Sequence, residues 1–268
     1  TQISGMSKNA FESYLFKDGK PMALTSLNKS DEAPFQYGHL SLKAILAVRD
    51  KRLAQTIDTV LLYNGRGFTR FNTGMESTSS TGYGVAKYDN EAIPEGFRSQ
   101  SGKNYTHAPL FWLSVIYLNY AEACAELGNI TQDDLDKSIN LLKDRAGLPH
   151  LNPIVGFSDP ANNHGVSDLI WEIRRERRCE LMFDNDNRYW DLIRWHQLDK
   201  LDTTKYPDII LGANVANDMD GCEANKVGKY IDGSKDGSRI YDKKHYLYPI
   251  PTGQIALNPQ LAPNNPGW

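Results

Sequence analysis

The sequence lacks the residue spacings that mark metal and nucleotide sites. Its three cysteines, Cys124, Cys179 and Cys222, lie far apart, which argues against a zinc cluster and against a disulfide framework. Its six histidines include no His-x-x-x-His pair, so we expect no dedicated zinc site. The chain has neither a Gly-x-Gly-x-x-Gly fingerprint nor a P-loop. We therefore expect no metal ion and no cofactor.

The sequence also lacks a surplus of basic charge and a long apolar run. It holds 30 basic and 33 acidic residues, giving a net charge of −3. No overall positive field attracts a phosphate backbone, so nucleic acid is not an expected partner. No apolar stretch approaches the length that crosses a bilayer. The chain starts at Thr1 without a signal segment or a nearby lipidation cysteine, so we expect that it was processed or is part of a longer protein.

What the chain does contain divides it into three regions. Apolar residues make up 40% of it, enough for a packed core. Residues 1–108 are rich in Gly, Ser, Thr and Asn, which predicts loops, with a short helix at 40–50 and a strand that ends the stretch 52–63. Residues 109–201 show helical spacing, and residues 202–268 are irregular and end in a proline-rich stretch. We expect this last region to lie extended over the helices.

Four helices are predicted in the middle region. Apolar residues occupy two faces of the first, at 109–127, so we expect it to be buried nearly all round. Thr131 is a good N-cap for a second, amphipathic helix that ends before Gly147. The short connection predicts an antiparallel pair similar to one tetratricopeptide unit. Two further helices are predicted at 166–183 and 187–201.

The third of these helices carries charge where its apolar face should continue. The next turns of that face hold Glu176, Arg177 and Glu180. Either the two glutamates form a catalytic acid–base pair, or they pair with arginines in a buried lattice that joins helices. Arginine binds carboxylates in a bidentate way and lowers their pKa, whereas a catalytic acid needs a raised pKa, so the second interpretation is favoured. The predicted structural ion-pair lock consists of Glu176, Arg177, Glu180, Arg188, Asp191 and Arg194.

The same residues carry a resemblance to a known family. The stretch IRRERRCELMFDNDNRYWDLIRW (173–195) resembles the signature of the SusD/RagB family of outer-membrane glycan-binding lipoproteins. The chain departs from the family pattern at Asp184-Asn185 and at Lys51, and neither is a candidate ligand position. Family members are usually much longer, so the chain resembles their C-terminal half. Other stretches similar to family landmarks follow the family order: KDGKP (17–21), RDKRL (49–53), YLNYAEACAELG (117–128), INLLKDRAGLP (139–149) and YPIPTGQIALNPQLAPNNPGW (248–268).

The resemblance implies a binding protein rather than an enzyme. It implies a mainly α fold with tetratricopeptide-like helix pairs, long irregular loops and a few short strands, that is, a SusD-like α/α superhelix. It also implies capture of oligosaccharide or polysaccharide at the outer leaflet of the outer membrane of Bacteroidetes-type bacteria. Delivery to a SusC-like TonB-dependent transporter would complete nutrient uptake. The membrane attachment implied is an N-terminal lipid anchor that this chain does not include.

The loop-rich first region offers side chains suited to sugars. Sugars stack their C–H faces on aromatic rings and bond their hydroxyls to amide or guanidinium groups, commonly on loops held by a rigid scaffold. Each aromatic of the stretch 63–88 either contacts ligand or packs as a core residue that pins the loop. Family ligand contacts often follow the Arg-Asp-x-Arg-Leu landmark, which favours this stretch. The candidate ligand-binding residues are Tyr63, Asn64, Arg66, Phe68, Phe71, Tyr83 and Tyr88.

Two other functions stay open at this point. A helical glycoside hydrolase or lyase needs two carboxylates facing solvent about 5–10 Å apart in one pocket. A binding protein exposes aromatic side chains there instead. A tetratricopeptide-like scaffold binds a partner protein through the groove of its helices. The placement of the carboxylates and aromatics therefore discriminates between these functions.

Overall fold

The prediction of a mainly helical fold is confirmed by the structure, a computed structural model that describes residues 5–27, 42–62, 79–90, 92–98, 100–107, 109–184, 187–215, 226–234 and 237–268. The helices found there are α1 (Lys8–Ser13), α2 (Lys43–Leu46), α3 (Lys51–Thr56), α4 (Glu95–Arg98), α5 (Leu113–Glu126), α6 (Gln132–Asp136), α7 (Ile139–Ala146), α8 (Asp168–Glu180), α9 (Asn187–Arg194) and α10 (Thr252–Leu257). The strands are β1 (Ile57–Leu62), β2 (Gly82–Val85), β3 (Leu211–Asn214), β4 (Lys226–Val227) and β5 (Tyr230–Asp232). Short 3-10 helices are η2 (Leu198–Leu201), η3 (Pro207–Ile209), η4 (Lys243–Tyr246) and η5 (Pro259–Leu261).

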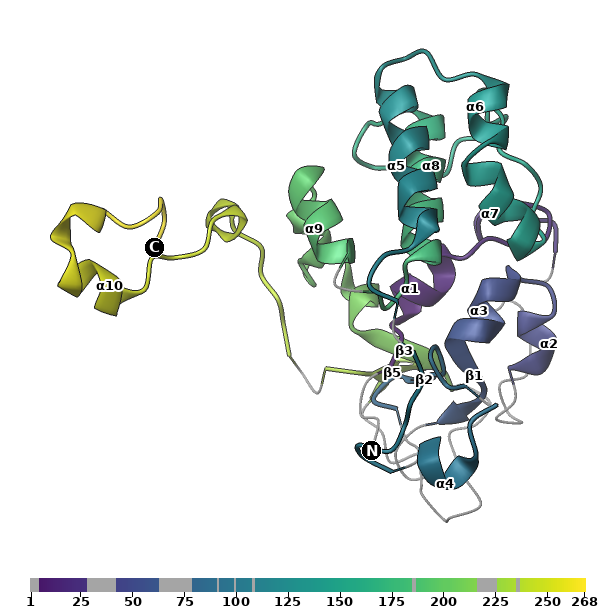
Figure 1. Ribbon diagram of the computed structural model, residues 1–268, viewed down its shortest axis with the longest axis horizontal. Coiled ribbons are helices and arrows are strands. Elements are labelled where there is room, and N and C mark those ends of the chain that lie inside the picture. The colour runs from purple at the N-terminus through teal and green to yellow at the C-terminus, as the bar shows by residue number, and fades with distance from the viewer. Residues whose placement is uncertain are drawn as a thin grey trace.

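The body of the molecule has a helical part and a sheet part. Figure 1 shows α5, α6, α7 and α8 together at one end, the strands at the other, and α1 between them. Each part has its own cluster of buried apolar side chains. Because α1 contributes to the sheet-side cluster and also packs against α8, it connects the two parts.

The helical part forms around residues predicted from their spacing. Thr131 caps α6, and its side chain and that of Asp134 form a reciprocal capping box, as the N-cap prediction requires. The single helix predicted after Thr131 is instead two helices, α6 and α7. They are interrupted at Ser138, whose hydroxyl donates to the Asp134 carbonyl at 2.6 Å, a local bond that competes with the helix. The fully or nearly buried apolar residues here are Leu118, Ala121, Leu135, Ile139, Leu142, Leu151, Ile173 and Leu181.

The expectation that the first helix is buried nearly all round is wrong. One face of α5 packs on α7 and α8 and buries Leu118 and Ala121. The opposite face exposes Leu113 and Ile116, at 63% and 60%. Apolar periodicity shows that two faces are apolar, but it does not show which of them the fold covers.

The sheet part consists of two small antiparallel sheets. β1 pairs with β2, and β5 lies between β3 and β4. The sheets meet at Gly212, where an added Cβ would lie 2.1 Å from the Thr81 carbonyl oxygen, and the Ala213 amide donates to that same oxygen at 2.8 Å. Glycine at position 212 therefore permits this close backbone approach.

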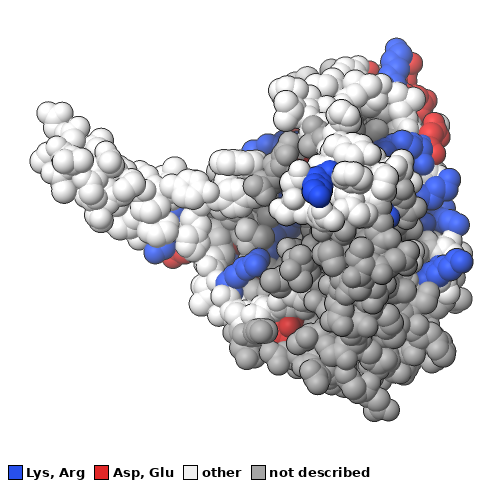
Figure 2. Space-filling view, turned by 60° about the horizontal axis from the view of Figure 1, so that its bottom comes forward, with Lys and Arg blue, Asp and Glu red and all other residues white. Residues whose placement is uncertain are grey.

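The last part of the C-terminal region does not lie over the helices as predicted, whereas its first part belongs to the body and supplies β3, β4 and β5. Figure 1 shows the chain leaving the body and ending in a separate extension that contains α10 and η5. At its base, η4 still contacts the body, because the Tyr246 hydroxyl accepts from the Leu198 N–H at 3.1 Å. None of these three helices has a buried residue. Residues 247–268 include no Lys, Arg, Asp or Glu, and the outer part of the extension is uniformly white in Figure 2. The prolines prevent a long helix, as expected, but they do not direct the segment onto the core.

Candidate functional site

The structure describes only two of the seven candidate ligand-binding residues. Tyr83 lies on β2, is fully buried and stacks on Phe11 with ring centroids 4.4 Å apart. The prediction of a ligand contact at Tyr83 is therefore corrected: its ring is part of the core and is closed off from a ligand. The other candidates, Tyr63, Asn64, Arg66, Phe68 and Phe71, lie outside the described residues.

Tyr88 is the one described candidate with an exposed ring. It lies just after β2 in a left-handed backbone conformation, with φ 74°, and 43% of its surface is exposed. Its hydroxyl donates to Asp184, and the Lys87 ammonium group lies 2.8 Å from the same carboxylate. Burial and the bond to Asp184 raise the pKa of Tyr88, so its hydroxyl stays protonated while part of the ring faces solvent.

One half of the predicted ion-pair lock joins α3 to α8. Arg52 contacts Glu176 and donates to Glu180 at 2.9 Å and to Asp50 at 2.7 Å. Lys143 of α7 lies 3.6 Å from Glu176. Burial alone would raise the pKa of Glu176, but Arg52 and Lys143 outweigh it and hold that pKa below its usual value. The RDKRL and ERRCEL stretches, distant in the sequence, thus meet in space.

The other half joins α8 to α9 and α5. Arg177 donates to Asp191 at 2.7 Å, and Arg194 contacts Asp191 at 2.9 Å and Glu122 at 2.6 Å. Trp195 also donates to Glu122. Arg188 is the exception to the predicted lock, because within the described residues it makes no ion pair with a carboxylate.

The carboxylates of α8 do not form a solvent-facing pair. Glu172 and Glu176 are 4% and 3% exposed, and Glu180 is bonded to Arg52 and Arg145. Burial raises the pKa of Glu172 to about 8, a value typical of a catalytic acid. Its oxygens, however, accept from Arg175 Nε at 3.0 and 3.2 Å, away from solvent. This arrangement disfavours the hydrolase interpretation for α8.

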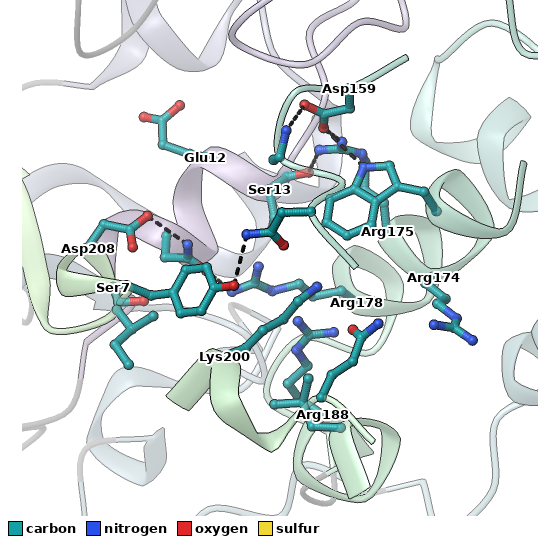
Figure 3. Close-up of a pocket in the computed structure, with 18 of the residues that line it drawn as sticks. Ser7, Glu12, Ser13, Asp159, Arg174, Arg175, Arg178, Arg188, Lys200 and Asp208 are labelled. Atoms are coloured by element: carbon teal, nitrogen blue, oxygen red, sulfur yellow. Dashed lines mark hydrogen bonds and ion pairs between the residues drawn. The ribbon is translucent and has the colours of Figure 1, made fainter. Parts of the chain in front are cut away.

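A cavity of about 680 Å³ opens beside the same helix. Side chains from α1, α8, α9, η2 and η3 line it, so it lies where the N-terminal helix meets the arginine-rich one (Figure 3). Its volume is within the range typical of small-molecule sites. Its basic lining residues in the described parts of the chain are Arg174, Arg175, Arg178, Arg188, Lys200 and Arg239.

Polar and aromatic groups complete the cavity wall. Arg178 donates to the Asn9 side-chain oxygen at 2.7 Å, and Asn163 donates to the Tyr206 hydroxyl at 2.8 Å. The Lys200 ammonium lies 4.5 Å from the centroid of the Trp171 ring. In Figure 3 the head groups of Arg178, Arg188 and Lys200 gather together, with Glu12 and Asp208 toward the other side.

Sequence reasoning missed this cavity. Of the arginines of α8, the predicted lock names Arg177, which the structure pairs with Asp191. The signal lay in the spacing of Arg174 and Arg178, which are four residues apart and share a helix face different from that of Arg177. Lys200, Trp171 and Tyr206 had no recognisable signal, because only the fold brings their segments together.

Among the parts of the chain that the structure covers, no group of three or more His, Cys, Asp or Glu side chains is arranged to hold a metal ion. The helices within those parts include none long and apolar enough to cross a membrane. In comparisons with known proteins, the family model described as the SusD family matches residues 4–268. No curated protein and no solved structure shows a significant match.

Proposed function

Because the chain belongs to the SusD family, we propose that it captures oligosaccharide or polysaccharide at the cell surface without cleaving it. The proposal places the protein on the outer leaflet of the outer membrane as a lipoprotein. There it passes its ligand to a SusC-like TonB-dependent transporter. The observation that carries this proposal is the family match over residues 4–268, nearly the whole chain.

The geometry of the carboxylates supports binding over hydrolysis. A glycosidase needs a carboxyl group of raised pKa and a second carboxylate facing the same pocket. Here Glu176 and Glu180 are held by Arg52 and neighbouring basic groups. Positive charge around Glu176 favours its ionised form and so opposes proton donation from it. Both glutamates thus stabilise the fold by joining α3 and α8.

The proposed sugar site is the loop surface that ends at Tyr88. Its residues are Tyr63, Asn64, Arg66, Phe68, Phe71 and Tyr88. Tyr88 supports it because its hydroxyl is fixed by Asp184 while its ring remains partly exposed. A ring held in this way offers a sugar face a flat surface with little loss of side-chain entropy on binding.

Isothermal titration of the protein against a panel of soluble polysaccharides tests the proposal. We expect binding without released product, weakened in Tyr63→Ala, Phe68→Ala and Tyr88→Ala. Tyr105→Ala is the matched control, because this tyrosine is 61% exposed and lies outside the candidate loop. Release of shorter saccharides would overturn the binding role, and equal losses in the control would overturn the site. Co-purification with a TonB-dependent transporter from outer membranes tests delivery.

A further inference from the structure

The cavity beside α8 holds more positive charge than its own carboxylates balance. Of the lining residues in the described ranges, six are basic and three are acidic. One of the six, Arg174, pairs with Glu126 outside the lining, at 3.0 Å. An unbalanced charge away from bulk water is costly unless a counter-charge is supplied. Each of the three acids already contacts another side chain: the pairs are Asp159–Arg175, Asp208–Asn9 and Glu12–Arg49.

Arg188 and Lys200 are the clearest case. Across the ranges that the structure describes, neither side chain has a carboxylate within ion-pair distance. The carboxylates whose charge does act on them are Asp191 and Asp199, respectively. Both are occupied: Asp191 accepts from Arg177 and Arg194, and an Asp199 oxygen lies 3.1 Å from His164 Nε2.

The environment weakens both cations. Burial, together with the charges of Arg188 and Arg178, lowers the pKa of Lys200 to about 7. Burial, with the charge of Arg178, likewise lowers the pKa of Arg188 to about 9. Side chains with such depressed pKa values occur at functional sites more often than elsewhere in proteins. A bound anion would relieve the mutual repulsion and the missing solvation together.

The paired arginines of the same helix provide the contrast. Arg177 has Asp191, and Arg175 has Asp159 and Glu172. The fold therefore supplies a carboxylate where an arginine of α8 serves structure. Among the described residues, no carboxylate lies within ion-pair distance of Arg178, whose guanidinium donates to the Asn9 amide oxygen. The charge of Asp208 acts on Arg178 from farther away. Arginine also suits the recognition of carboxylate or sulfate oxygens, because its planar fork donates two bonds at once.

We propose that this cavity binds the carboxylate or sulfate group of an acidic saccharide, held by Arg178, Arg188 and Lys200. Trp171 and Tyr206 offer aromatic surface in the same wall, and Asn163 offers an amide for hydroxyl groups. The anionic part of this inference rests on the cavity alone. That the acid group belongs to a saccharide rests on the proposed function.

Isothermal titration with glucuronate, glucose 6-sulfate and glucose provides the test, with sodium sulfate and sodium acetate as bare anions. We expect the two acidic sugars to bind and glucose to bind at least roughly tenfold more weakly, since a charge-assisted bond is lost. Arg188→Gln and Lys200→Gln should each weaken acidic-sugar binding by roughly tenfold. The matched control is Lys103→Gln, which removes an exposed cation far along the chain from the cavity residues. Thermal unfolding of each variant verifies that it is folded.

Each outcome decides the inference. Acidic-sugar binding that falls in both cavity variants and not in Lys103→Gln supports it. No binding of glucuronate or the sulfate ester, or equal binding by wild type and cavity variants, overturns it. Bare sulfate or acetate binding as tightly as the sugars overturns the saccharide part. Polysaccharide capture that depends on Tyr63, with no acidic-sugar binding, leaves the proposed function standing. Acidic-sugar binding with no polysaccharide bound overturns that function instead.

Discussion

At the scale of single residues, Lys200 makes ligand binding depend on pH. Its pKa is lowered to about 7, first by burial and then by Arg188, Arg178 and Arg174, with Asp199 opposing them. A bound carboxylate raises that pKa by favouring the ammonium form. A uronate carboxyl is already ionised well below pH 7, so the ligand itself does not titrate in this range.

We therefore expect the affinity for glucuronate to be highest below pH 7 and to fall as the pH rises above it. Above pH 7, binding must be accompanied by proton uptake at Lys200. Titrations at pH 6, 7, 8 and 9, in buffers of different ionisation enthalpy, measure both effects. The Lys200→Gln variant should bind more weakly and show no pH dependence between pH 6 and 8. At pH 9 the affinity should fall in both proteins, because the pKa of Arg188 is lowered to about 9. A slope between pH 6 and 8 that persists in this variant would assign the titration to a group other than Lys200.

Asp191 is the residue whose loss should cost the most stability in the lock. Arg177 is 7% exposed, and its one other side-chain partner among the described residues is the Asn119 amide oxygen at 2.9 Å. Asp191→Ala thus leaves a buried guanidinium without a carboxylate, and we expect a loss of about 3–5 kcal/mol in unfolding free energy. Denaturant unfolding measures it. Asp133→Ala breaks an exposed pair with Lys137 and should cost far less, because solvent screens that pair. Similar losses in the two variants would refute a structural role for the lock.

The sequence predicts that these charged residues form ion pairs, but it does not predict which partner each of them has. Charges on the apolar face of α8 required pairing, which follows from the cost of burying them. Which carboxylate pairs with which arginine depends on segments such as the loop that carries Asp159. The spacing of residues along a helix does not indicate these pairings. The prediction that Tyr83 contacts ligand is wrong for a related reason. A tyrosine between two glycines suggests a loop, but β2 is buried along its whole length.

At the scale of elements, the junction between the two sheets depends on Gly212. Any side chain there would collide with the backbone of Thr81, which cannot move aside as a flexible side chain does. We expect Gly212→Ala to lower the unfolding free energy by roughly 1–3 kcal/mol through overpacking. Gly96 of α4 has no atom within 4 Å of its added Cβ, so Gly96→Ala should be neutral or stabilising by about 0.5–1 kcal/mol. Equal stability of the two variants in denaturant titrations would contradict the close approach.

The positions of the helices were predicted from the sequence, but which of their faces are buried was not. Apolar spacing and caps predicted α5, the segment of α6 and α7, α8 and α9, because these signals are local. The break at Ser138 reflects a side-chain bond to the Asp134 carbonyl, which competes with a pattern that otherwise reads as continuous. The exposed face of α5, with Leu113 and Ile116, depends on which neighbours the fold supplies. Which face of a helix is buried thus depends on how the elements pack together, and the spacing of apolar residues alone does not predict it.

At the scale of the whole molecule, the order of the landmarks predicted the family, and the structure shows why they occur together. The RDKRL stretch and the ERRCEL helix form one buried ion-pair network. The closing landmark, residues 248–268, takes no part in that network and lies in the extension (Figure 1). Its place in the sequence was predictable, but its separation from the body was not. Leu257 illustrates the reason, because 81% of its surface remains exposed where the proline-rich pattern suggested packing.

The extension should therefore contribute little to the stability of the body. Beyond residue 247 its clearest bond to the body is that between the Tyr248 and Tyr189 hydroxyls, 3.0 Å apart and exposed, which is worth about 1 kcal/mol at most. We expect a chain truncated after Leu247 to keep its melting temperature within about 4–5 °C and to bind glucuronate as the intact chain does. Calorimetry and titration of the two chains side by side measure this, with Asp191→Ala as the destabilised reference. A drop as large as that of Asp191→Ala would mean that residues 248–268 pack on the body in solution. In that case the exposed side chains of the extension would be covered by the protein's own helices, as the sequence first suggested.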